Sequence, residues 1–110
     1  MMDFTETCQA AVNHFGYQSQ SMMAIEEMAE LQKEICKHFR GKSNFYQIAE
    51  EIADVQIMLE QLIILHDCRD AVEEWKFAKL FRLKELMSDG KNTGSPSNYL
   101  CSEDWLSQLD

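Results

Sequence analysis

Acidic side chains at helical spacing are the residues of this sequence that could carry out chemistry. Glu51 and Asp54 lie three residues apart in the stretch EEIADVQIMLEQLIIL, residues 50–65, so both fall on one face of a helix that is apolar on most of its surface. Burying an ionised carboxylate among apolar groups costs free energy unless a positive group compensates for it. The position of these two acids therefore indicates a cation as their partner.

A second acidic stretch, EEMAE, is separated from Glu51 by twenty residues after its last glutamate. It contains Glu26, Glu27 and Glu30, and Glu34 follows one turn later. On a helical wheel these glutamates lie roughly opposite the apolar arc of their segment, where a solvated acidic face is the ordinary interpretation. Glu27 and Glu30 nevertheless share one helix face, as the two later acids do. An antiparallel helical hairpin would bring those two faces together.

Four carboxylates that converge in a partly dry cleft would repel one another strongly unless a hard cation lay between them. Oxygen ligands without His or Cys favour Mg²⁺, with Mn²⁺ as the alternative, over zinc. Mg²⁺ commonly completes its coordination with water and substrate phosphates, which indicates a nucleotide or polyphosphate substrate. The predicted metal ligands are Glu27, Glu30, Glu51 and Asp54.

Four helical segments are expected to position these acids, because apolar residues recur at helical spacing and no strand pattern is present. One proline and four glycines also leave little material for turns. The predicted helices span about 3–15, 19–39, 45–66 and 70–88. We expect Ser19 or Ser21 to cap the second helix and Ser43 or Asn44 to cap the third. The second and third helices would form an antiparallel hairpin, so the predicted fold class is all-α.

The predicted domain covers residues 1–88, and residues 89–110 are predicted to form a linker and a short C-terminal helix. The linker stretch, SDGKNTGSPSN, is rich in Ser, Gly and Asn and contains the only proline. The stretch SEDWLSQL at 102–109 follows it and has the pattern of a short capped helix.

Composition restricts the partners and the compartment of the protein. A formal charge of −9 over 110 residues argues against nucleic acid and against anionic membrane surfaces as partners. No apolar run approaches the roughly 20 residues of a membrane span, and the N-terminal stretch lacks the pattern of a secretory signal. The four cysteines form no CxxC pair, which favours free thiols in a reducing environment. We therefore expect a cytoplasmic protein.

The two acidic motifs also carry a family resemblance. EEMAEL followed by EEIADVQIML resembles the MazG-like, all-α nucleoside triphosphate pyrophosphohydrolase superfamily, which carries EExxE on one helix and ExxD on the next. The resemblance covers about residues 14–86 and includes GYQSQ and KLFRLKEL. It implies a four-helix MazG-like bundle that cleaves a nucleoside triphosphate between its α and β phosphates.

The resemblance also implies roles for individual residues. The four predicted ligands would hold Mg²⁺, and Glu26 or Glu27 would orient or deprotonate the attacking water. Lys79 and Arg82, at i and i+3, would contact the phosphates, and Gln20 would hydrogen-bond the base. A lysine stem that lies along apolar surface is the structural alternative for Lys79.

Other interpretations remain open at this point. A non-catalytic helical dimerisation or regulatory module would use the apolar hairpin but has no need of buried acids. A dUTPase-like or dCTPase-like member of the same superfamily would have a narrower substrate. The sequence HD at His66–Asp67 is also found in metal-dependent phosphohydrolases, but those need further histidines. The surface of the third helix is too apolar for one small chain to cover, so we expect a homodimer or homotetramer with its active site near a subunit interface.

Overall fold

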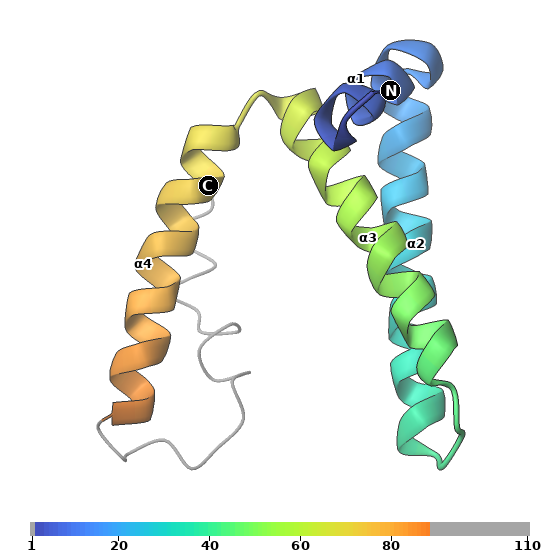
Figure 1. Ribbon diagram of the computed structural model, residues 1–110, viewed down its shortest axis with the longest axis vertical. Coiled ribbons are helices and arrows are strands. Elements are labelled where there is room, and N and C mark those ends of the chain that lie inside the picture. Colours follow the sequence, from blue (N-terminus) through green and yellow to red (C-terminus); the bar gives the residue numbers. More distant parts are fainter. Residues whose placement is uncertain (1, 89–110) are drawn as a thin grey trace. The chain divides into compact units, whose positions relative to one another are not determined.

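Helices make up the structure, a computed structural model that describes residues 2–88 (Figure 1). The helices are α1 at Phe4–Phe15, α2 at Tyr17–Phe39, α3 at Phe45–His66 and α4 at Arg69–Ser88. Residues 2–88 contain no strand, which confirms the all-α prediction. The predicted linker and C-terminal helix lie outside the described residues.

A single glycine joins α1 to α2. Gly16 has φ of 90°, in the left-handed region that glycine adopts without strain, and its N–H donates to Val12 O at 2.9 Å. The chain can therefore end one helix and begin the next within one residue. The prediction that Ser19 or Ser21 caps α2 is wrong, because the helix already begins at Tyr17 and its N-cap is Gly16.

Helices α2 and α3 form the predicted antiparallel hairpin (Figure 1), and a buried polar contact closes its loop end. Asn44 precedes α3, as predicted for its cap, but its side chain crosses to α2 instead of capping its own helix. Its Nδ2 donates to Glu34 O at 2.8 Å and to Glu34 Oε1 at 3.0 Å. Lys37 Nζ donates to the second carboxylate oxygen of Glu34 at 2.9 Å.

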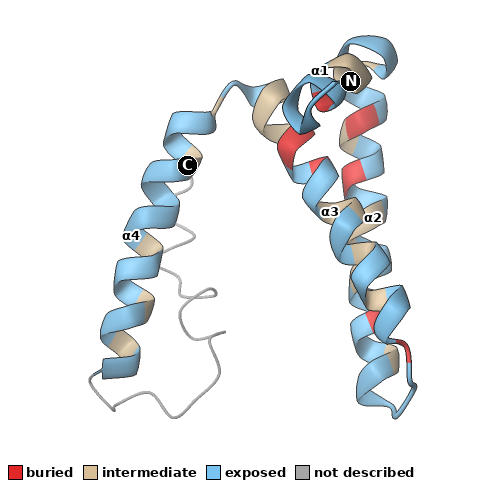
Figure 2. Ribbon diagram, viewed as in Figure 1, coloured by how far each residue is buried: buried red, intermediate tan, exposed pale blue. Residues whose placement is uncertain are grey.

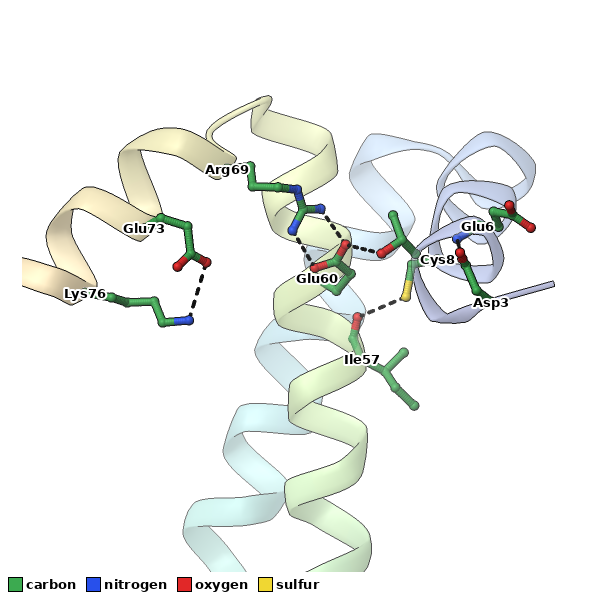
Figure 3. A network of polar contacts seen from close by, with 9 residues as sticks. Asp3, Glu6, Cys8, Ile57, Glu60, Arg69, Glu73 and Lys76 are labelled. Atoms are coloured by element: carbon green, nitrogen blue, oxygen red, sulfur yellow. Dashed lines mark hydrogen bonds and ion pairs between the residues drawn. The ribbon is translucent and has the colours of Figure 1, made fainter.

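A second polar cluster holds α1 against α3 at the other end of the hairpin (Figure 3). The buried Glu60 accepts from Thr5 Oγ1 at 3.2 Å and from Arg69 Nη1 and Nη2 at 3.1 and 2.5 Å. The buried Cys8 thiol donates to the carbonyl oxygen of Ile57 at 3.8 Å. The α1 helix is thus fixed by contacts to residues one turn apart on α3.

The chain divides into two compact units, residues 1–69 with α1 to α3, and a second unit that begins at Asp70. The α4 helix has no buried residue, and Phe77, Leu80 and Phe81 are exposed on it. The predicted domain boundary at residue 88 stays a prediction. No described helix combines the length and the apolar character that crossing a bilayer requires.

Few of the described residues are buried (Figure 2), and most of the buried ones are polar. Its buried apolar residues are Cys8, Ala24 and Met58. Its buried polar residues are Gln20, Glu34, Asn44, Glu60 and Gln61. Most large apolar side chains of α2 and α3 are exposed or half-buried. The hairpin is therefore held in register largely by hydrogen bonds between its buried polar side chains.

Candidate metal centre

Three carboxylates converge between α2 and α3. Glu27 comes from α2, and Glu51 and Asp54 come from α3, where the i, i+3 spacing places them on one face. One carboxylate oxygen from each residue lies within 4.8 Å of the others, and all three residues are half-buried. A hard cation can bridge carboxylate oxygens at such separations, directly or through its bound water molecules.

Two buried polar contacts set the register that brings these carboxylates together. Gln20 Nε2 donates to Gln61 Oε1 at 2.6 Å near one end of the hairpin. The contact between Asn44 and Glu34 fixes the other end. Glu27 lies seven residues from each of these anchors along α2, so both of them constrain its position.

None of the described residues places a positive group against the three carboxylates. Burial raises the pKa of Glu27 above its ordinary value, and the charges of Asp54 and Glu51 raise it further. Burial also raises the pKa of Glu51, as do the charges of Asp54, Glu30 and Glu50. In residues 2–88, no lysine or arginine forms an ion pair with Glu27, Glu51 or Asp54.

One oxygen of the centre has no hydrogen-bond partner among residues 2–88. Glu51 Oε2 is buried from solvent, and none of the described residues donates to it. Glu27 approaches Glu51 closely, but two ionised carboxylates offer only acceptors to each other. A proton, a cation or a water molecule that donates to both can compensate for this contact. The all-oxygen donor set fits Mg²⁺ or Mn²⁺.

The other predicted metal and catalytic residues lie at the margin of this centre. Glu30 is exposed, and its Oε2 lies 3.9 Å from Lys33 Nζ. Its charge still contributes to the raised pKa of Glu51, so it is near the centre but outside the group of three. Glu26 is exposed on α2. The structure thus brings together three of the four predicted ligands.

The predicted substrate-binding residues occupy different environments. Gln20 is buried and hydrogen-bonded to Gln61, so its amide is part of the hairpin interior. Lys79 and Arg82 lie on α4, where Lys79 Nζ is 5.3 Å from the ring centroid of Trp75. Partial burial lowers the pKa of Lys79, and the neighbouring Arg82 charge lowers it further.

The sequence did not reveal how the glutamates of α2 divide between structural and metal-centre positions. Glu34 belongs to the same acidic stripe as Glu27, yet its carboxylate is committed to Asn44 and Lys37. Gln61 was also missed, although its pairing with Gln20 helps to set the register of the centre. The sequence offers one signal for this role, since Gln61 is a polar residue within an otherwise apolar stretch of helix.

Comparisons of the chain with protein-family models, with curated proteins and with solved structures found no match. The likeness to the MazG-like superfamily therefore rests on the two motifs and on the residues around them. The geometry of the three carboxylates is an independent observation.

Proposed function

We propose that this protein is a Mg²⁺-dependent nucleoside triphosphate pyrophosphohydrolase with a MazG-like fold. The observation that carries the proposal is the meeting of Glu27 with Glu51 and Asp54, from the two motifs that resemble the superfamily. The reaction adds water to the α-phosphorus and breaks its bond to the oxygen that bridges to the β-phosphorus. The products are a nucleoside monophosphate and pyrophosphate.

Each residue of the centre has a chemical role in this proposal. Glu27, Glu51 and Asp54 would hold the metal, and Glu30 would bind it from the exposed margin. Bound Mg²⁺ supplies charge neutralisation of the phosphates and lowers the pKa of coordinated water. Glu26 or Glu27 would accept the proton of the attacking water or orient it. Because these carboxylates come from two helices held in register by hydrogen bonds, the fold positions them before substrate binds.

Positive charge for the triphosphate must come from outside the three carboxylates. We propose Lys79 and Arg82 for this role, because both lie on one helix at i and i+3. A guanidinium and an ammonium together suit several phosphate oxygens. Gln20 is proposed to contact the base, which would require it to exchange its hydrogen bond with Gln61 for one to the substrate.

Assembly and compartment complete the proposal. We propose a homodimer or homotetramer, because many large apolar side chains of the described helices are exposed in the single chain. Cys8, Cys36 and Cys68 are free thiols, which together with a nucleotide substrate suits the cytoplasm.

The test is a product analysis of the purified full-length chain. Each canonical ribonucleoside and deoxynucleoside triphosphate is incubated with the protein, once with Mg²⁺ and once with EDTA. We expect monophosphate and pyrophosphate from at least one substrate, in equal amounts and only with Mg²⁺. Diphosphate and orthophosphate as products would contradict the proposed bond cleavage. No turnover of any substrate by the folded, Mg²⁺-loaded protein would favour the non-catalytic helical module.

Activity confined to dUTP or dCTP would support the same chemistry with a narrower substrate. That result would identify the protein as a dUTPase-like or dCTPase-like enzyme.

A further inference from the structure

Asn44 occupies the N-cap position of α3, but its side chain does not cap that helix. An N-cap asparagine ordinarily accepts a hydrogen bond from the first turn of its own helix through its side-chain oxygen. Here Oδ1 has no hydrogen-bond partner among the described residues, whereas Nδ2 donates to the backbone oxygen and to Oε1 of Glu34. The amide of Asn44 thus joins α3 to α2 instead of ending α3.

This contact lies two helical turns from the metal centre on both helices. Glu34 follows Glu27 by seven residues on α2, and Asn44 precedes Glu51 by seven residues. Seven residues return to nearly the same helix face after about 10.5 Å. The contact and the carboxylates therefore lie along the same interface between the helices. Uninterrupted helix connects them on each side.

The contact is attached to the main chain of both helices. Glu34 O belongs to the backbone of α2, so the bond to it at 2.8 Å constrains the helix and not only a side chain. Asn44 O accepts from Ile48 N at 3.0 Å, which fixes Asn44 to the first turn of α3. Asn44 and Glu34 are both buried. Loss of the amide would therefore release one helix from the other at this end of the hairpin.

The contact is also the principal buried one between the metal centre and the loop of the hairpin. Among residues 28–50, Glu34 and Asn44 are the only buried ones. The buried apolar residues of the hairpin, Ala24 and Met58, lie on the opposite side of the carboxylates along the helices. Repulsion among the three carboxylates acts to separate α2 from α3. On the loop side, the amide of Asn44 opposes this separation.

We infer that Asn44 is a positioning residue for the metal centre, which holds Glu51 at a distance from Glu27 that a cation can bridge. The inference rests on the proposed function for the identity of the cation, but not for the contact between the helices. Metal ligands must be held within about 0.5 Å of their productive geometry, and loss of a supporting hydrogen bond commonly costs about 10–100-fold in metal affinity. The alternative is that Asn44 serves only to begin and stabilise α3.

Two substitutions separate positioning from capping. Asn44→Ser and Asn44→Asp introduce residues that cap helices as well as asparagine does, but both remove the amide donor to Glu34. Asn44→Asp also places a second carboxylate beside Glu34, so it is the stronger perturbation, and Asn44→Ser serves if that variant does not fold. The controls are Ser43→Ala, at an exposed neighbour, and Glu60→Gln, which removes a buried carboxylate at the other end of the hairpin.

For each full-length variant we would verify folding by circular dichroism and measure the affinity for Mg²⁺ by calorimetry. We expect the dissociation constant for Mg²⁺ to rise by about 10–100-fold in both Asn44 variants and to stay at the wild-type value in both controls. Unchanged affinity in the Asn44 variants would overturn the inference and leave capping as the role of this residue. An equal rise in Glu60→Gln would also overturn it, because loss of stability alone would then explain the effect.

A metal-free measurement distinguishes failure of this inference from failure of the proposed function. In chelator, Glu51→Gln should raise the free energy of unfolding, because it relieves repulsion that the Asn44 contact holds in place. In the Asn44→Ser background the carboxylates can separate, so about half or more of this gain should be lost. A wild type that shows this coupling but binds no Mg²⁺ would contradict the proposed function and support the role of Asn44 in holding the carboxylates. Strictly additive effects of the two substitutions would contradict that role, whatever the affinity for Mg²⁺.

Discussion

Carboxylates lie at three levels of the α2–α3 hairpin, and the buried ones at the ends differ from the half-buried ones in the middle. At one end Glu60 accepts from Thr5 and from both terminal nitrogens of Arg69. Hydrogen bonds and charge from Arg69 lower the pKa of Glu60 in spite of its burial. At the loop end, hydrogen bonds from Asn44 and Lys37 lower the pKa of Glu34 in the same way.

The carboxylates in the middle show the reverse. Burial and mutual repulsion raise the pKa of both Glu27 and Glu51, and none of the described residues supplies a cation to them. Burial alone therefore does not separate structural acids from acids that can bind a ligand. The separating feature is whether the fold itself provides the donor. At the two ends it does, whereas in the middle none of the described residues supplies one.

Removal of a charge from the middle should have the largest effect on activity. The Glu51→Gln variant keeps the shape of the side chain but removes one negative ligand. We expect kcat to fall by about 10²–10³-fold, a loss typical of removing one preorganised electrostatic group. The free energy of unfolding in chelator should stay the same or rise, because repulsion within the centre is reduced.

Glu50→Gln is the matched control for this experiment, since it makes the same change at an exposed neighbour. It should keep near wild-type activity. An equal fall in kcat in both variants, or full activity in Glu51→Gln, would contradict a special role for the carboxylates in the middle of the hairpin.

Mg²⁺ should stabilise the middle of the hairpin directly. A ligand that binds only the folded state adds about 2.7 kcal/mol to the free energy of unfolding at 100 times its dissociation constant. We expect this gain in thermal or denaturant unfolding of the wild type and its loss in Glu51→Gln. NaCl at equal ionic strength is the control, because screening alone also stabilises an acidic chain. An identical gain with NaCl would mean that the centre does not bind the metal.

At the end of the hairpin, the loss of a carboxylate should destabilise the fold instead. Glu60→Gln leaves Arg69 beside a neutral side chain, and we expect the free energy of unfolding to fall by about 2 kcal/mol. This is below the value for a fully buried pair, because the Arg69 side chain is 47% exposed. Mg²⁺ binding, measured by calorimetry, should be unchanged.

The exposed pair of Glu73 and Lys76, 3.5 Å apart, offers the control in Figure 3. Glu73→Gln removes the same charge from an ion pair but should leave stability unchanged within error. A larger loss in Glu73→Gln than in Glu60→Gln would show that burial is not the cause.

The hairpin and two acids of the centre could be predicted from the sequence, and the reasons are local. Helical periodicity predicted α2 and α3, and the i, i+3 spacing placed Glu51 and Asp54 on one face. The start of α2 was not predictable in the same way. A glycine such as Gly16 ends a helix in many sequences, and only its positive φ allows another helix to follow at once.

The environment of Glu27 was harder to predict. A helical-wheel analysis assumes that the apolar arc of a helix is the face that packs on the rest of the protein. In α2 the apolar arc is largely exposed, and Ile25 and Phe39 are among its exposed residues. The face that packs on α3 is a mixture of Gln20, Ala24 and acidic residues. A helical wheel does not distinguish apolar residues that pack within the chain from apolar residues that remain exposed on it.

The smallest effect should be the pH dependence, and its sign differs between the two kinds of acid. Because the folded-state pKa of Glu27 and Glu51 is raised, the metal-free folded protein binds protons more readily than the unfolded chain. Their contribution in chelator should therefore become more favourable as pH falls from neutrality through these raised values. For Glu60 the pKa is lowered, so its contribution is present above the unfolded-state pKa and is lost as pH falls through the folded value.

Denaturant unfolding at a series of pH values, for the wild type, Glu51→Gln and Glu60→Gln, separates these contributions from those of the other acids. In chelator, the difference between wild type and Glu51→Gln should shrink on mild acidification, whereas the difference for Glu60→Gln should persist until stronger acid. The gain from Mg²⁺ should fade over the same mild range, since the metal requires deprotonated ligands. If both variants showed the same pH dependence, the middle and the end of the hairpin would be electrostatically alike. The raised pKa values would then have no role in metal binding.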